Sequence, residues 1–298
     1  MSEPKGRVAV WTVLFPPDPP QERRRSDEGR QRLKAARRRG GQTLHAEWTK
    51  LRTLAGTGWL LLGTVAATAG VSVFAVESTS CRDGLGCPGD PAKLTLTGVQ
   101  FGQVVVAVLA VLAVSGEYST GMISVTLAAM PRRPAVLAAK AAVVTGLVLV
   151  AGTIGVLASV LAGRLILPGH GFSPARGYAP LSLFDGTVLR AAAGSVLYLA
   201  LIALLSLGAA TVIRESGFAI GAVLALLYMF PIIASVVTDP HWARHLQQLA
   251  PMTAGLDIQA TTGLSSLPLS PWAGLGVLAA WAGGALLAGG LVLRLRDA

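Results

Sequence analysis

Charged side chains are scarce in this sequence of 298 residues, where Asp, Glu, Lys and Arg make up only 13% and hydrophobic side chains make up 52%. The mean hydropathy of +0.59 is well above that of a soluble domain. Cysteine is scarcer still, and two residues, Cys81 and Cys87, exclude a disulfide framework. Their spacing allows a small disulfide loop in an oxidising exterior, and two free thiols are the alternative. We therefore predict an integral membrane protein.

Six long apolar runs follow one another, and none has Asp, Glu, Lys, Arg or His in its interior. They lie near residues 57–77, 97–115, 141–163, 191–213, 217–238 and 272–293. Each is close to the roughly 20 residues that a helix needs to cross a bilayer. Because lipid offers no partners for backbone polar groups, an all-α bundle of six transmembrane helices is expected. Small residues spaced three or four apart would allow close helix contact, as with Gly63, Ala67 and Gly70 or Ala280, Gly284 and Ala288.

The chemistry that many membrane proteins carry is absent from these runs. They supply no Ser/His pair, Asp pair or His-Glu-x-x-His site, and the chain has no Gly-x-x-x-x-Gly-Lys-[Ser/Thr] phosphate loop. No catalysis and no cofactor of its own are therefore expected. A transporter driven by an ion gradient usually carries ionisable residues at midplane, and these runs have none.

The most polar groups inside the runs are two glutamines, Gln100 and Gln103. They either line a substrate path or bond neighbouring helices. Pro231 in the fifth run predicts a kink that shapes a cavity. Between the fifth and sixth runs, His241 and His245 have the spacing of two zinc ligands, but no third ligand is evident, so no metal site is expected. Ser182 and Asp185 have capping-box-like spacing ahead of the fourth run.

The positions of the basic residues are more informative than the net charge of +10, which therefore does not predict a nucleic-acid partner. Nineteen of the 25 Lys and Arg residues fall on the side of the termini, which predicts that both termini are cytoplasmic. Residues 1–43 combine Pro and Arg clusters with little apolar periodicity, and they predict a disordered basic tail. Either this tail is attracted to anionic lipid headgroups or it is a solvated extension.

Two amphipathic segments are expected on the same side of the membrane. The first is an interfacial helix in which Leu44, Trp48 and Leu51 share a face, while Lys50 and Arg52 lie off it. The second falls between the second and third runs, where Ile123, Leu127 and Met130 share a face. Pro131 should end this helix, Arg132 and Arg133 lie in the break, and Pro134 should open the next helix in its first turn.

The second segment carries a resemblance to a known family through the residues Glu117, Tyr118, Ser119, Thr120, Gly121, Met122, Ile123, Thr126, Leu127, Pro131, Arg132, Arg133 and Lys140. With the stretch His45 to Thr53, these residues resemble type-2 ATP-binding-cassette (ABC) export permeases, from about Leu44 to the C-terminus. The resemblance implies that 117–130 is the coupling helix that meets the ATPase, and that Leu44 to Arg52 forms an elbow along the cytoplasmic surface. It also implies short re-entrant helices within 239–271.

The function that this resemblance implies is a plasma-membrane permease subunit of an ABC exporter, with residues 44–298 as the permease domain. A separate ATPase subunit would bind ATP and Mg²⁺, and a second permease subunit, identical or homologous, would pair with this one. Tyr118, Met122 and Ile123 would fill a pocket on the ATPase, while Glu117, Arg132 and Arg133 fix the register. The alternative is a non-transporting membrane scaffold that engages lipid or a cytoplasmic partner.

Overall fold

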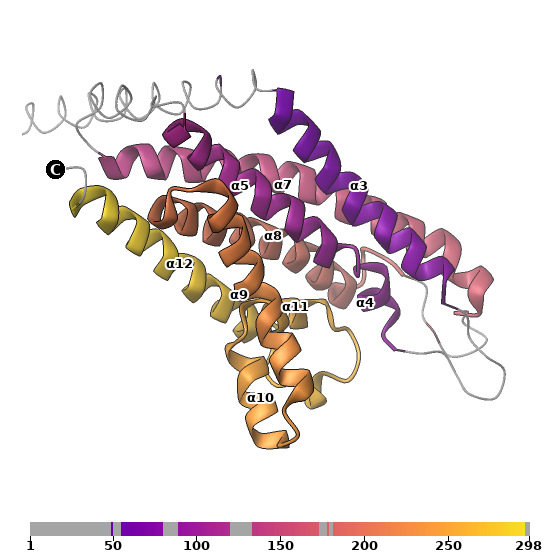
Figure 1. Cartoon of the computed structure of the whole chain (residues 1–298). Coiled ribbons are helices and arrows are strands. Elements are labelled where there is room, and N and C mark those ends of the chain that lie inside the picture. Colours follow the sequence, from indigo (N-terminus) through magenta and orange to yellow (C-terminus); the bar gives the residue numbers. More distant parts are fainter. Residues whose placement is uncertain are drawn as a thin grey trace, which may run out of the picture. The chain divides into compact units, whose positions relative to one another are not determined.

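The computed structural model describes residue 49 and residues 55–79, 89–119, 133–172, 178 and 181–295, all within the unit Ala46–Ala298. These residues form helices and no strand, and six of the helices are long and apolar enough to cross a membrane (Figure 1). The prediction of an all-α protein with six transmembrane helices is confirmed. The six are α3 (Ala55–Glu77), α5 (Val99–Ser119), α7 (Arg133–Ile166), α8 (Gly186–Ile213), α9 (Ser216–Val236) and α12 (Pro271–Leu295).

Short helices join the spans at one end of the bundle, which we call the α4 end. They are α4 (Pro91–Thr95), η1 (Leu167–His170), α10 (Pro240–Leu249), α11 (Pro251–Leu256), η3 (Asp257–Gln259) and η4 (Leu264–Ser266). At the opposite end, which we call the loop end, α5 leads into the segment 120–132 and α8 leads into α9. Within the described residues, the short connecting helices therefore lie at the α4 end.

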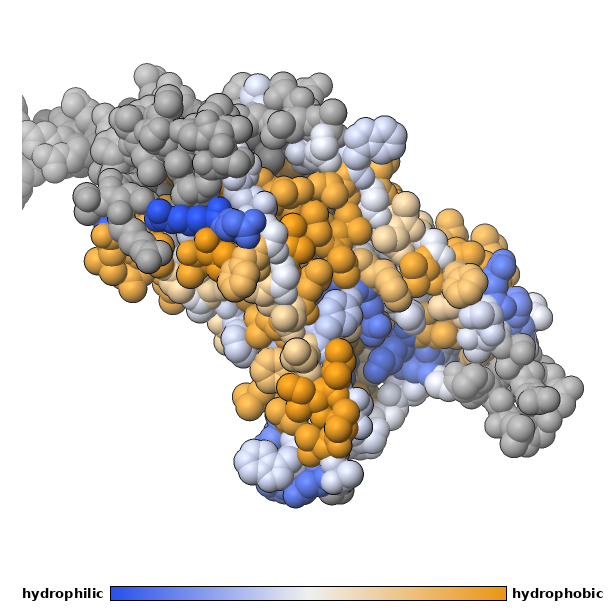
Figure 2. Space-filling view, viewed as in Figure 1, coloured by the Kyte–Doolittle hydropathy of each residue, from blue (hydrophilic) through white to orange (hydrophobic). Residues whose placement is uncertain are grey.

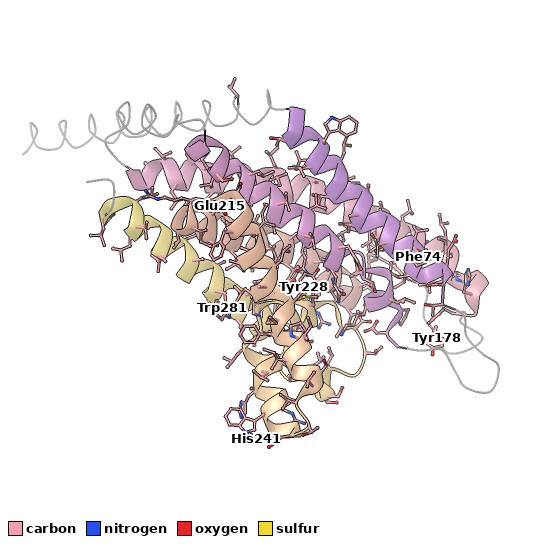
Figure 3. All side chains as sticks on the ribbon, in the orientation of Figure 1. Phe74, Tyr178, Glu215, Tyr228, His241 and Trp281 are labelled. Atoms are coloured by element: carbon pink, nitrogen blue, oxygen red, sulfur yellow. The ribbon has the colours of Figure 1, made fainter. Side chains whose placement is uncertain are left out.

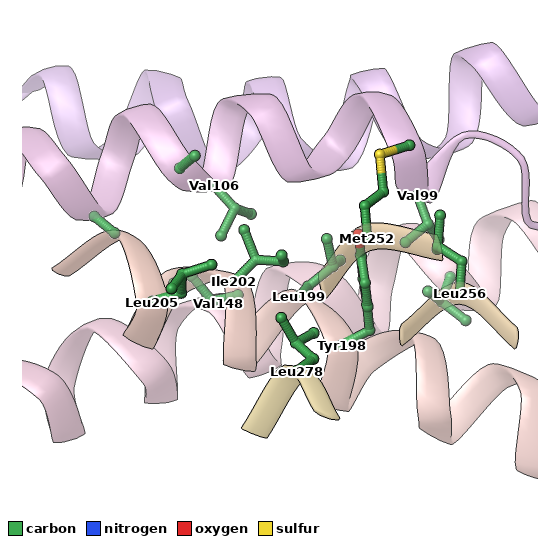
Figure 4. Packing of buried hydrophobic residues seen from close by; sticks show 14 of the residues in the cluster. Val99, Val106, Val148, Tyr198, Leu199, Ile202, Leu205, Met252, Leu256 and Leu278 are labelled. Carbon is green, nitrogen blue, oxygen red and sulfur yellow. The ribbon is translucent and has the colours of Figure 1, made fainter. Parts of the chain in front are cut away.

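The span α8 forms the centre of the bundle. It packs against α5, α7, α9 and α12, and it is the most buried of the six spans. Its side chains Tyr198, Leu199, Ile202 and Leu205 lie in the core (Figure 4). On the outer helices, large apolar side chains are exposed, as expected for helices in contact with lipid. The face shown in Figure 2 is largely apolar over the described residues.

Close helix contacts use small residues other than those proposed from the sequence. Ala280 and Gly284 are exposed on α12, and Gly63 and Gly70 do not bring α3 close to a backbone. Instead, a Cβ on Gly208 would lie 2.5 Å from the carbonyl carbon of Ala285, so α8 and α12 touch there. Within the described chain the closest helix contacts therefore do not use the proposed small-residue faces, because in an Ala- and Gly-rich chain the spacing alone does not select the packed face.

The first span has its polar side inside. Thr64, Thr68 and Ser72 are buried against α5 and α7, while Trp59 and Phe74 are exposed. Ser72 Oγ accepts a hydrogen bond of 3.1 Å from the Gly98 N–H, and Ser159 Oγ donates one of 3.3 Å to the Thr68 carbonyl. Thr64 Oγ1 donates instead to the Leu60 carbonyl of its own helix at 2.9 Å. In lipid this arrangement is favourable, since a buried hydroxyl group finds its partner on a neighbouring helix or in the preceding turn of its own helix.

Acidic residues cap the helices near both ends of the bundle. Asp185 caps α8 by accepting from the Thr187 N–H at 3.0 Å, and Glu215 caps α9 in the same way from Gly217 at 2.8 Å. The expected capping box is thus shifted, because Asp185 is itself the N-cap and Ser182 accepts from the Phe184 N–H. Arg214 joins α8 to α9 in the left-handed region at φ 64°, which allows the chain to reverse at once.

Candidate functional sites

The predicted coupling segment lies mostly outside the described residues. Glu117, Tyr118 and Ser119 form the last residues of α5, and Arg133 is the first residue of α7. The stretch from Thr120 to Arg132, including Gly121, Met122 and Ile123, falls outside the described part. Since α7 begins at Arg133, Pro134 lies in its first turn, as predicted, but Arg133 belongs to the helix and not to the break where it was expected.

The helices on either side of this segment are joined by a buried lysine. Lys140, only 5% exposed, lies two turns into α7, and its Nζ donates a hydrogen bond of 2.9 Å to the Ala113 carbonyl of α5. A buried ammonium is costly unless hydrogen bonds satisfy it. The sequence placed Lys140 just before a span and within the family motif, but it gave no sign that this side chain turns inward. The loop ends of α5 and α7 are therefore fixed to each other.

The two glutamines of the second span have different places. Gln103 is completely buried, and its Nε2 donates to Tyr228 Oη at 3.1 Å and to Met252 Sδ at 3.4 Å. Tyr198 Oη donates to Gln103 Oε1, so one side chain joins α5, α8, α9 and α11. Gln103 thus bonds neighbouring helices, one of the two roles considered above. Figure 4 shows Tyr198 reaching toward Met252 within the core.

Gln100 takes part in this group through its backbone, because its carbonyl accepts a hydrogen bond of 2.8 Å from Tyr228 Oη. Pro231 lies in α9 one turn beyond Tyr228, and α9 continues to Val236. Its neighbour Phe230 packs edge-on against Trp281 of α12, with ring centroids 6.4 Å apart; Figure 3 labels Tyr228 and Trp281. The structure thus brings Gln103, Gln100 and Tyr228 together.

Several other predicted residues lie outside the described part of the chain. They are Cys81 and Cys87, and the elbow residues Leu44, Trp48, Lys50, Leu51 and Arg52. The helical pair His241 and His245 is described: both side chains are exposed, and their rings meet edge to face at 4.6 Å. Figure 3 shows His241 at the far end of α10.

A second polar group, which the sequence did not reveal, lies at the α4 end. Asp90 caps α4 by accepting from the Ala92 N–H at 3.0 Å, and it also accepts from Thr261 Oγ1 at 2.7 Å and the Thr262 N–H at 2.9 Å. Burial alone would raise the pKa of Asp90, but these hydrogen bonds outweigh it and hold the pKa below its ordinary value. Asp-Pro before a short helix is a local capping signal, but a partner 171 residues away leaves no local pattern.

Asp257 lies near this group, in η3. Burial raises the pKa of its carboxyl group from the usual 3.8 to about 6, and the attraction of Lys93 on α4 offsets part of that rise. Arg190 of α8 contacts the same segment three residues further on, where its Nη2 donates a hydrogen bond of 2.5 Å to the Ala260 carbonyl. Charged groups at the α4 end are therefore used to hold segments together.

Comparison with known proteins adds no relatives. No protein-family model matches this chain, and no curated protein matches it.

Proposed function

We propose that this chain is the membrane-spanning permease subunit of an ABC exporter, which moves a substrate across the plasma membrane with ATP hydrolysed by a separate ATPase. Two copies, or this chain and a homologous one, pair around the path. The loop end faces the cytoplasm, so the segment 117–130 and the turn at Arg132 and Arg133 meet the ATPase. The resemblance of those residues to the family motif is the source of the assignment.

The structural observation that supports this proposal best is the pair of helices that flank the coupling segment. The 34 residues of α7 run without a break from Arg133 to Ile166. At about 1.5 Å per residue this helix is about 50 Å long, against about 30 Å of hydrocarbon. Lys140 fixes its loop end to α5. A push on the coupling segment would therefore move two connected helices rather than a flexible linker.

The polar groups of the core also support an external source of energy. The buried core network consists of neutral side chains, namely Gln103, Tyr198 and Tyr228. The buried Lys140 lies near the loop end of α7 rather than in the middle of the bundle. A proton- or ion-driven transporter would need ionisable groups near midplane, and in the described spans the fully buried polar side chains other than Lys140 are neutral.

The test is co-purification of the full chain with a cassette ATPase from its native membrane. Tyr118→Asp or Met122→Asp would place a charge in the proposed contact, and either should abolish ATP-linked export while the protein stays in the membrane. Phe184→Asp is the matched control, since Phe184 is completely exposed at the α4 end. Export that survives both coupling variants would overturn the assignment.

A further inference from the structure

The segment Asp257–Thr262, which we call the strap, follows α11 and leads toward η4, the short helix before α12. It has little regular structure beyond the short η3 helix, yet Ile258 is fully buried and Gln259 is 1% exposed. Burying a segment with no α-helix of its own costs conformational entropy and requires partners for its polar groups. The contacts that meet this cost come from α4, the start of α5 and α8.

The first half of the strap is seated on α8 and on the turn before α5. Gln259 Nε2 donates to Ser195 Oγ of α8 at 3.0 Å and to the Leu96 carbonyl at 3.5 Å. The Ile258 side chain lies directly against Gly194, where an added Cβ would collide with it. The strap therefore covers the point where α8 passes the start of α5.

The second half of the strap is held by charged groups. The Ala260 carbonyl accepts from Arg190, and Asp90 accepts from both backbone N–H groups and one hydroxyl of Thr261 and Thr262. Hydrogen bonds to a carboxylate are roughly twice as strong as neutral ones. Because Asp90 also caps α4, one carboxylate ties the helix that follows the first span to the segment that precedes the last.

The strap is also connected to the core. Met252 of α11, five residues before Asp257, accepts a hydrogen bond from Gln103. Gly255 of α11 packs against the Tyr198 ring, so a Cβ there would lie 2.7 Å from Cε2. A movement of the strap and α11 away from α8 would thus uncover the buried Gln103 and Tyr198.

We propose that the strap is a latch that closes the α4 end of the bundle, with Asp90 as its catch. Loss of the Asp90 contacts releases residues 257–262 from α4 and exposes Ser195 and the α5–α8 boundary. The latch itself is a property of this chain alone. That its opening lets a substrate leave rests on the proposed function.

The experiment uses the full chain with Cys81→Ser, Cys87→Ser and a reporter, Ser195→Cys, which lies under the strap and is fully buried. The rate at which a water-soluble maleimide labels the reporter measures how often the strap opens. Asp90→Ala should raise this rate by about tenfold or more, since several charge-assisted hydrogen bonds are lost. Asp90→Asn keeps the cap but replaces one acceptor oxygen by a donor, and it should give a smaller rise.

The matched control is Asp185→Ala. Asp185 also caps a helix at the α4 end, but its hydrogen bonds are to Thr187, two residues away. This variant should change the labelling rate less than about twofold, because it removes a cap without removing an inter-segment tie. Equal effects of Asp90→Ala and Asp185→Ala would overturn the latch, and so would rapid labelling with Asp90 intact.

A second variant covers the case in which Asp90→Ala fails to fold. Thr261→Val removes one hydroxyl donor and leaves the α4 cap in place. It should raise the labelling rate several-fold, and an unchanged rate would contradict the proposal. None of these measurements uses an ATPase. A negative result would therefore refute the latch without touching the proposed function, and failed co-purification would leave the latch standing.

Discussion

The Nζ of Lys140 on α7 donates a hydrogen bond of 2.9 Å to the carbonyl of Ala113 on α5, and only 5% of the lysine is exposed. This contact lies about two turns from the segment 120–132 on each of the two helices that flank it. It converts the two ends into one unit. If the coupling segment receives force from an ATPase, this is a contact through which α5 and α7 share it.

Replacing this lysine should affect coupling as well as folding. Lys140→Met keeps the length and the apolar stem but removes the donor. Because a charge-assisted hydrogen bond in a buried place is lost, the free energy of unfolding should fall by about 1–3 kcal/mol. Transport per ATP hydrolysed should drop severalfold in the reconstituted complex. Lys140→Arg, which retains a charged donor, should recover part of it, and equal coupling in all three proteins would contradict this role.

The two glutamines of α5 offer a matched pair. Gln103→Leu leaves the buried hydroxyl of Tyr198 without its acceptor, which should cost about 1–3 kcal/mol of unfolding free energy. Gln100→Leu keeps the backbone carbonyl that Tyr228 uses, so its effect should stay within about 0.5 kcal/mol. Denaturant unfolding in detergent measures both. Similar losses in the two variants would show that the network does not stabilise the bundle.

The packing of α8 against α12 should be disrupted by an added methyl group at Gly208 but not by one at Gly284. Gly208→Ala places a Cβ 2.5 Å from the Ala285 backbone, and the helices must separate, at about 1–3 kcal/mol. Gly284 has no atom within 4 Å of its would-be Cβ, so Gly284→Ala should leave the midpoint of thermal unfolding unchanged or raise it slightly. The reverse order would place the wrong face of α12 against α8.

The pH dependence of the strap should follow Asp257. Its pKa is about 6 when the strap is closed and should return toward 3.8 when opening exposes it to water. Between these values the closed form binds more protons, so closure is favoured as pH falls from about 6 to 4 and is weakened as pH rises through that range. Asp90 contributes in the opposite sense, but its lowered pKa puts that change below pH 3.8. Lys93 on α4 is the charge that acts on Asp257, while Arg190 on α8 donates to the Ala260 carbonyl of the strap.

The measurement is the labelling rate of Ser195→Cys with Asp257, divided at each pH by the rate with Asp257→Asn, which removes the intrinsic pH dependence of the reagent. The ratio should rise on the order of tenfold between pH 4 and pH 7. This rise is smaller than the change in the opening equilibrium that a pKa shift of about two units would allow, because Asp257 is partly solvated. A ratio that is constant, or that falls with pH, would mean that Asp257 does not oppose closure.

The positions of the spans could be read from the sequence because hydrophobic length alone determines them. Their inward faces could not, since lipid-exposed and buried faces of α12 are both apolar and small residues occur on every side. The start of α7 could be predicted from Pro134, but the burial of Lys140 could not, because a lysine next to an apolar run gives no sign that its side chain lies between helices. The ties between Asp90 and the strap join residues 171 apart in the sequence, and only the fold brings them together.

Whether the segment after α5 docks on an ATPase is tested most directly by crosslinking in the intact membrane. A photoreactive amino acid at Met122 should capture a cassette ATPase, whereas the same group at Phe184, at the opposite end of the bundle, should capture none. Capture of the ATPase from position 184 would contradict the account. So would failure to capture it from position 122, together with labelling of a cysteine at position 124 from outside intact cells.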